Sequence, residues 1–94
     1  MSGRAVLRLA AMDNVATALR PLEAGETVDL EGLSICVTEP VPLCHKLALG
    51  DLEAGAAVVK YGQPIGVTTA AIQAGAHVHV HNMRSARARQ SPPA

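Results

Sequence analysis

The sequence predicts a small all-β domain built from short strands and tight turns. Apolar and polar residues alternate with a period near two in several short segments, whereas no long segment keeps the regular period of a helix. A turn signature, Leu-Glu-Ala-Gly, occurs at residues 22–25 and again at residues 52–55, and a shorter relative, Ile-Gln-Ala-Gly, occurs at residues 72–75. Repeated turns between alternating segments are typical of a β fold.

The signature belongs to an internal near-repeat. Residues 15–28 and 45–58 share an Ala-Leu pair, the Leu-Glu-Ala-Gly turn and the valine that follows it, and residues 72–78 repeat the turn and the valine. Glycine adopts positive φ without steric cost, so a glycine at a fixed place in each copy indicates a tight turn. Each turn is expected to start the chain on a new extended segment.

The expected strands, in order, contain Val6, Val15/Thr17/Leu19, Leu47/Leu49, Val58/Val59 and Val78/Val80. The nearest alternative is a helix over residues 10–20 with Asp13 as its N-cap, but its helical period is irregular and a strand is preferred. Residues 39–43 and 62–66 are predicted to be turns, because their prolines fix φ and lack an amide donor for a sheet.

The chain of 94 residues fits one domain, residues 1–83, followed by a tail, residues 84–94, whose Arg, Ser, Ala, Gln and Pro composition predicts disorder. It contains no Phe, no Trp and a single Tyr, so the core must be built from Val, Leu and Ile. Such a thin core predicts that the isolated chain forms a homo-oligomer to cover its apolar surface.

The formal net charge is +0, but the charges are unevenly distributed. All 8 acidic residues lie between residues 9 and 83, where the cations are Arg20, Lys46 and Lys60. The other arginines are too sparse for a nucleic-acid surface. Because no apolar run is long enough to span a bilayer and no secretory signal is apparent, we expect a cytoplasmic protein without a membrane segment, with Cys36 and Cys44 reduced.

His77, His79 and His81 alternate with two valines. On a strand the three imidazoles would project from one face, with Val78 and Val80 on the other, and the outer two would lie about 13 Å apart. Two of them, but not three, would then be close enough to share a metal unless the strand bends. The row is interpreted either as a solvated or interface row, or as a contact for substrate or for a metal held by a partner. No metal site formed by this chain alone is predicted.

Two other segments combine a cation with a turn. Pro42-Leu-Cys-His-Lys46 places His45 and Lys46 after a proline-stiffened turn, where Lys46 would be the point charge for a carboxylate; the alternative is a pair at a strand start on a solvated face. Lys60-Tyr-Gly-Gln-Pro-Ile-Gly66 is either a binding loop or a hairpin turn with a packed tyrosine. Cys44 is not expected to be a nucleophile, because neighbouring strand residues point to opposite faces and Cys44 would then not reach His45.

Five blocks follow one another over residues 5–83: Asp13-Asn-Val-Ala-x-Ala-Leu19, Pro42-Leu-Cys-His-Lys46, Asp51-Leu-x-Ala-Gly55, Lys60-Tyr-Gly-x-Pro-Ile-Gly66 and Ala74-Gly-x-His-Val-His-x-His-Asn82. In this order they resemble the SAF-type domain of the altronate and galactarate dehydratase family. In that family the domain is either part of a long enzyme or a separate short chain, and the same module resembles the small subunit of sulfolactate sulfo-lyase.

The resemblance implies a β-clip fold and the role of a small accessory subunit in a metal-dependent hydro-lyase, which acts on a sugar acid by α-proton abstraction and β-elimination. It also implies that the divalent metal, iron or manganese, belongs to a large dehydratase-like partner subunit. The chain departs from the family at Cys44, where glycine is usual. This departure affects the geometry before His45 if the position requires positive φ.

Three functions therefore remain open: a lyase subunit acting on a sugar acid or on sulfolactate, a non-catalytic acid- or carbohydrate-binding module, and a structural interaction domain. For the lyase, the expected catalytic residues are His45 and Lys46. The expected substrate-binding residues are Lys60, Tyr61, Gly62, His77, His79, His81 and Asn82. The chain alone is expected to be inactive, because it offers too few acid–base groups and metal ligands for the whole reaction.

Overall fold

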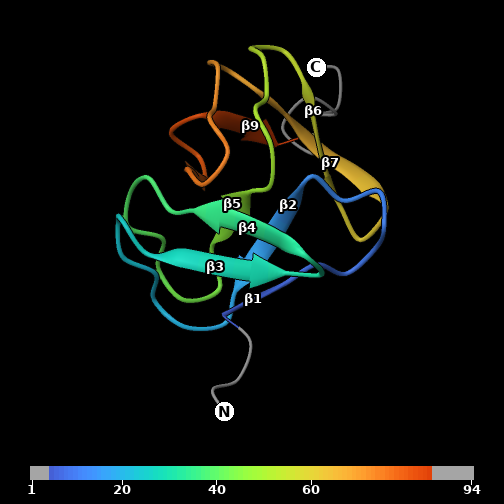
Figure 1. Cartoon of the computed structure of the whole chain (residues 1–94). Coiled ribbons are helices and arrows are strands. Elements are labelled where there is room, and N and C mark those ends of the chain that lie inside the picture. The colour runs from blue at the N-terminus through green and yellow to red at the C-terminus, as the bar shows by residue number, and fades with distance from the viewer. Residues whose placement is uncertain (1–4, 86–94) are drawn as a thin grey trace, which may run out of the picture.

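A computed structural model describes residues 5–85, which form strands and turns without a helix, so the predicted all-β fold is confirmed (Figure 1). The strands are β1 (Val6–Leu7), β2 (Val15–Ala18), β3 (Thr27–Leu30), β4 (Leu33–Cys36), β5 (Lys46–Ala48), β6 (Ala57–Lys60), β7 (Gln63–Thr68), β8 (His77–Val78) and β9 (Met83–Ser85). They form three antiparallel sheets, ordered β1-β2-β5-β8, β3-β4 and β6-β7-β9. Within residues 5–85, the structure offers no helix of the length and apolar character that crossing a membrane requires.

The three copies of the turn signature adopt the same conformation, as the repeat predicts. Gly25, Gly55 and Gly75 have φ of 94°, 85° and 90°. In each copy the residue after the glycine donates its amide to the carbonyl three residues earlier, as in a turn that requires positive φ at its third position. Each turn then leads into a strand, β3, β6 or β8.

Gly75 is the most constrained of the three glycines. A Cβ atom at this position would lie 1.8 Å from the carbonyl oxygen of Cys36, whereas a Cβ at Gly25 would meet no atom within 4 Å. The backbone at Gly75 is also paired on both sides, because its amide donates to Ala48 and its carbonyl accepts from Thr38. The third copy is therefore held against the rest of the chain at the start of β8.

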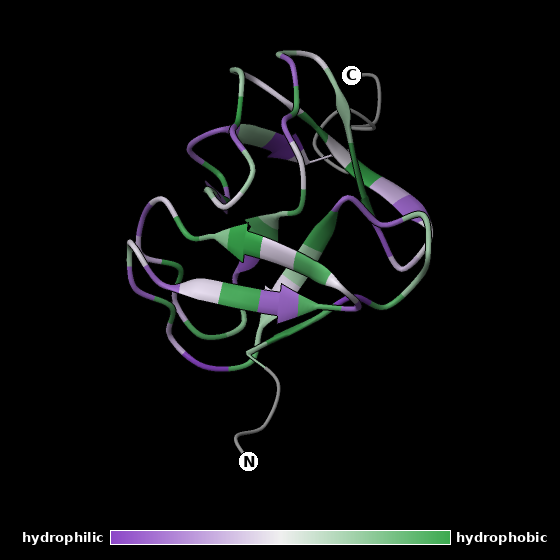
Figure 2. Ribbon diagram, viewed as in Figure 1, coloured by the Kyte–Doolittle hydropathy of each residue, from purple (hydrophilic) through white to green (hydrophobic). Residues whose placement is uncertain are grey.

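The four-stranded sheet contributes to two apolar clusters. Alanines of β2, with Leu47 of β5, pack with the β3–β4 hairpin, whereas Val15 and Ala48 pack with Val58 of β6 and Val78 of β8. In Figure 2, β3 alternates along its length between apolar and polar residues, in agreement with its alternating buried and exposed positions. The core is assembled from small aliphatic side chains, as the composition predicts.

Some predicted elements are wrong in detail. Residues 63–66, predicted as a turn, belong to β7, where Pro64 is opposite Val59 at an irregularity in register. A proline is tolerated at such a bulge because one ladder hydrogen bond is already missing there. Leu19, expected on the apolar face, is 42% exposed, because β2 buries its alanines instead.

Strand β9 corrects the predicted domain boundary. Arg84 and Ser85 pair with β7, so the ordered part extends past residue 83, where the domain was predicted to end. The rest of the predicted tail, residues 86–94, lies outside the described residues.

Candidate functional site

His45 is the last residue of a turn that ends directly before β5. The amide of His45 donates to the carbonyl of Pro42 over 3.0 Å, and Cys44, the third residue of this turn, has φ of 71°. A positive φ at this position favours glycine. The structure thus gives a physical reason why glycine is expected before His45, and Cys44 adopts the same conformation at a cost of about 1–2 kcal/mol.

Cys44 and His45 were expected on a strand, with their side chains on opposite faces. Both residues instead precede β5, so that expectation is wrong and does not exclude a Cys44–His45 pair. Both cysteines are free and exposed.

The histidine segment bends after two strand residues, so the predicted straight row of three imidazoles is wrong. The amide of Asn82 donates to the carbonyl of His79 over 3.0 Å and closes a turn. The Asn82 side chain holds this turn, because its Oδ1 accepts from the amide of His79 and its Nδ2 donates to the carbonyl of His77. Val80, expected in the core, lies at the tip of the turn and is 78% exposed.

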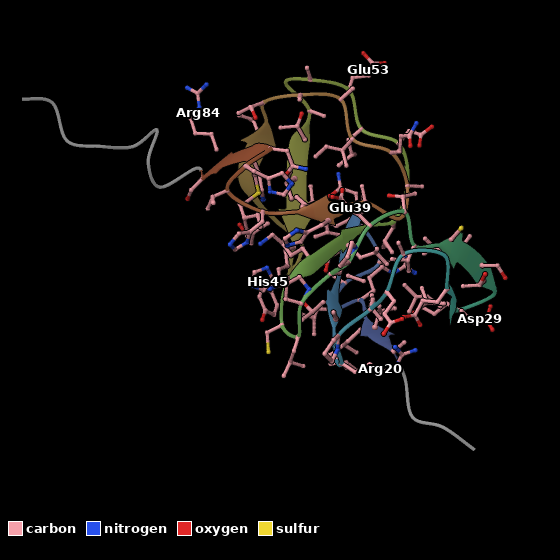
Figure 3. The ribbon with its side chains drawn as sticks, turned by 90° about the vertical axis from the view of Figure 1, so that its left-hand side faces the viewer. Arg20, Asp29, Glu39, His45, Glu53 and Arg84 are labelled. Carbon is pink, nitrogen blue, oxygen red and sulfur yellow. The ribbon has the colours of Figure 1, made fainter. Side chains whose placement is uncertain are left out.

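The bend brings His77 and His79 together with His45, which lies 32 residues away from His77 along the chain. His45 Nδ1 and His77 Nε2 are 2.8 Å apart, and the ring centroids of His45 and His79 are 4.2 Å apart. One ring nitrogen from each of the three histidines lies within 4.8 Å of the other two. We call His45, His77 and His79 the imidazole cluster. Figure 3 shows nitrogen-bearing side chains gathered beside His45, at the side of the molecule away from Asp29.

The fourth histidine is peripheral to the cluster. The ring centroid of His81 lies 5.2 Å from that of His77, and the residue is exposed. The backbone at His77 is further fixed by Glu39, whose Oε2 accepts the His77 amide over 3.2 Å.

The surroundings of His77 and His79 favour the neutral form of both imidazole rings. Burial lowers the pKa of His77, and the charges of His45, His81 and His79 lower it further, against a smaller opposing effect of Glu39. Burial likewise lowers the pKa of His79, with contributions from His45, Lys46 and His81. At neutral pH both rings therefore have unprotonated nitrogens that can accept a proton or bind a metal.

Lys46 is the first residue of β5 and is half-buried. Burial lowers its pKa, and so does the charge of Lys60. Lys46 also influences His79 electrostatically, so the structure brings the predicted cation close to the imidazole cluster.

The predicted Lys60–Gly62 segment forms a two-residue hairpin turn between β6 and β7. Tyr61 and Gly62 have φ of 59° and 71°, the paired positive values of a type I′ turn. Tyr61 is 62% exposed rather than packed, and the Lys60 ammonium lies 5.1 Å from the centre of its ring.

Sequence reasoning missed the residue that supports this turn. Asp13, considered there only as a helix N-cap, is buried and accepts the amides of Tyr61, Gly62 and Ala10 at 3.0, 2.8 and 3.0 Å. Burial alone would raise the pKa of Asp13, but the backbone hydrogen bonds together lower it. This role of Asp13 could have been inferred in part. Asp13 lies next to an apolar strand, and a carboxylate that is buried there needs hydrogen-bond donors.

The structure therefore places all the predicted site residues in two groups. The imidazole cluster with His81, Asn82 and Lys46 forms one, and the Lys60–Tyr61–Gly62 turn forms the other. The charge of Lys60, acting on Lys46, links the two groups.

This arrangement can be compared with known proteins. Residues 4–86 match the family described as the altronate/galactarate dehydratase SAF domain. The chain belongs to this SAF domain family. The match covers every strand described above, and so the resemblance of the five sequence blocks is confirmed.

Relatives of two kinds are found. The chain is 44% identical over 79 residues to an altronate dehydratase of Escherichia coli (strain K12), and 37% identical over 82 residues to one of Bacillus subtilis (strain 168). These alignments cover 84% and 87% of the chain but 16% of each dehydratase. The chain also shares 36% identity over 61 residues with the (2R)-sulfolactate sulfo-lyase subunit alpha of Paracoccus pantotrophus, covering 65% of the chain and 91% of that subunit. The chain thus corresponds to a small part of the dehydratases.

Proposed function

We propose that this SAF domain is the accessory subunit of a hydro-lyase that acts on a sugar acid. The observation that supports the proposal most directly is the likeness to altronate dehydratases, which extends over more than four-fifths of the chain. The imidazole cluster beside Lys46 supplies side chains suited to such a substrate. A large dehydratase-like subunit provides the other catalytic groups, together with iron or manganese.

The proposed reaction is a β-elimination from a hydroxy acid. A base removes the proton from the carbon next to the carboxylate, the bond from the β carbon to its hydroxyl breaks, and the hydroxyl leaves as water after it is protonated. The resulting enol becomes a 2-oxo acid. Anionic charge develops along the carboxylate side of the substrate, so a nearby cation stabilises the transition state.

Lys46 is proposed to bind the substrate carboxylate, and His45 to take part in proton transfer. The short contact between His45 Nδ1 and His77 Nε2 means that one of these nitrogens donates a hydrogen to the other. His77 therefore fixes the tautomer of His45 through this contact, and its low pKa favours a neutral partner.

The Lys60–Tyr61–Gly62 turn, with His77, His79, His81 and Asn82, is proposed to contact the rest of the substrate. Exposed apolar side chains occur in both turns that bear the histidines, Leu43 at 52% and Val80 at 78% exposure. We propose that the large subunit covers this surface and these two side chains.

A subunit of a sulfolactate sulfo-lyase is a second candidate. The observation that favours it is coverage, because the alignment reaches 91% of the Paracoccus pantotrophus alpha subunit, whereas it reaches only 16% of the dehydratases. The chemistry would be the same up to the leaving group, which would be sulfite instead of water.

The test uses the chain assembled with its large partner. Formation of 2-oxo acid is measured on a panel of sugar acids and on sulfolactate, with each chain alone as a control. Lys46→Ala is expected to lower kcat/KM by roughly 10- to 100-fold, since a charge-assisted contact contributes about 1.5–3 kcal/mol. Arg20→Ala, which removes an exposed cation paired with Glu26, is the matched control and should leave kcat/KM unchanged. Full turnover by the isolated chain, or equal activity of the Lys46 variant, would exclude the assignment.

A further inference from the structure

The imidazole cluster has the composition and spacing of a transition-metal site. His45 lies before β5 and His77 lies on the neighbouring strand β8, where the register pairs Leu47 with His77. His79 reaches the same point because the chain bends after Val78. Two strands and a turn thus direct three nitrogen ligands to one place, without any acidic residue among them.

The distances fit a small ion after minor adjustment. With metal–nitrogen bonds of about 2.0–2.1 Å, two nitrogens of a tetrahedral site lie roughly 3.3 Å apart. His45 Nδ1 and His77 Nε2 are 2.8 Å apart, and the three ligand nitrogens lie within 4.8 Å of one another. Metal binding therefore requires the three nitrogens to draw closer together than 4.8 Å, and it exchanges the contact between His45 and His77 for two metal bonds.

The backbone on either side of two ligands is already held in place. Asn82 bonds the amide of His79 and the carbonyl of His77, at 2.9 and 2.8 Å, and Glu39 accepts the amide of His77. These contacts fix the backbone from which His77 and His79 project. Neutral imidazoles, as favoured here by burial, are the form that binds metals.

We propose that His45, His77 and His79 bind one divalent late first-row transition ion, such as Zn²⁺. Each histidine contributes one ring nitrogen. Three imidazoles favour such an ion over Mg²⁺ or Ca²⁺, which prefer oxygen ligands. A three-histidine set leaves a fourth position for a water or a substrate oxygen. The proposal does not depend on lyase activity, because it concerns binding by this chain alone.

The charges around the cluster modulate the site. Glu39, whose Oε2 accepts the His77 amide, is an anion close to the site and favours a bound cation, whereas Lys46, the residue after His45, opposes it. Lys46→Gln is therefore expected to tighten metal binding, in contrast to the loss expected for any change of a ligand.

The experiment is a calorimetric titration of the full chain, free of any affinity tag, with Zn²⁺ and separately with Mg²⁺, followed by the visible spectrum with Co²⁺. One Zn²⁺ per chain, a rise in Tm with Zn²⁺ but not with Mg²⁺, and the intense absorption of four-coordinate Co²⁺ are expected. His79→Ala should weaken Zn²⁺ binding more than about tenfold. His81→Ala, an exposed histidine two residues away, is the matched control and should bind like the parent.

A second control concerns the thiols. Cys36 and Cys44 are exposed and could bind Zn²⁺ by themselves, so the Cys36→Ser/Cys44→Ser double variant is titrated as well and should keep its affinity. Circular dichroism without metal shows whether each variant folds. The proposal is overturned by absence of Zn²⁺ binding, by binding that persists in a folded His79→Ala variant, by binding lost with the thiols, or by a six-coordinate Co²⁺ spectrum.

Discussion

The carboxylate of Asp13 should be a major stabilising group of this domain, and its replacement is the sharpest test of the fold. Asp13 is 5% exposed and accepts three backbone amides, two of them from the Tyr61–Gly62 turn. Two of these amides donate to Oδ2 and one donates to Oδ1, so replacing either oxygen by an NH₂ group leaves at least one amide facing another donor. Leaving a buried donor unpaired costs about 1–3 kcal/mol.

Asp13→Asn is therefore expected to destabilise the domain by about 2–4 kcal/mol, because one oxygen remains while the new NH₂ group faces backbone donors. A loss of this size lowers the Tm of a domain this small by roughly 10–30 °C. Asp51→Asn is the matched control. Asp51 accepts a single amide, that of Ala74, at an exposed position, so a loss of no more than about 1 kcal/mol is expected.

Acid titration adds an independent signature. The pKa of Asp13 is lower in the folded state than in the unfolded chain, where it is about 3.9, so its contribution is fully present above that value and is lost as pH falls through the folded pKa. Chemical denaturation between pH 7 and pH 2 should show the difference between parent and Asp13→Asn shrinking only below about pH 4. A difference equal to that of the control, or one that does not change with pH, would refute the reasoning.

Three further variants test other parts of the structure. Cys44→Gly should stabilise the domain by up to about 1 kcal/mol because it relieves positive φ, whereas Cys44→Val should destabilise it, and equal Tm values for both would contradict the strained turn. Gly75→Ala should lower the free energy of unfolding by about 2–4 kcal/mol, because the new Cβ would overlap Cys36. Gly25→Ala should lower it by only about 1 kcal/mol, through backbone strain. Equal losses for the two variants in urea denaturation would contradict this distinction. Asn82→Ala should lower stability by about 1–2 kcal/mol and weaken Zn²⁺ binding, and unchanged calorimetric affinity would show that Asn82 does not position the histidines.

The repeat made much of the fold predictable from sequence. A glycine at one place in three similar segments has a local physical meaning, and all three glycines have the expected positive φ. Strand β7 was missed because Pro64 was read as a turn former, although a bulge lets it remain opposite Val59. Sequence rules take into account that proline lacks an amide donor. They do not show whether the register of the neighbouring strand already shifts at that position.

The site was predictable only in part. His45, Lys46 and the later histidines were identified from their chemistry and from the family resemblance, but their meeting point was not. An alternating pattern implies a straight strand, and a straight strand keeps His77 and His81 far apart. The bend after Val78 depends on hydrogen bonds from the Asn82 side chain and on pairing with β5, which are contacts that no periodicity reveals.

The three copies of the repeat show how the site is built from an ordinary hairpin unit. In the first two copies the strand after the turn runs for four residues and reverses through a two-residue turn, Glu31-Gly32 or Tyr61-Gly62. In the third copy Asn82 occupies the place of those glycines, β8 stops after two residues, and the Asn82 side chain bonds back to the strand end. The two positions that elsewhere complete the strand, here His79 and Val80, are freed from hairpin pairing. Because the shortened strand still pairs with β5, His79 is delivered next to His45, so the same turn unit that stabilises the fold in two copies positions the imidazole cluster in the third.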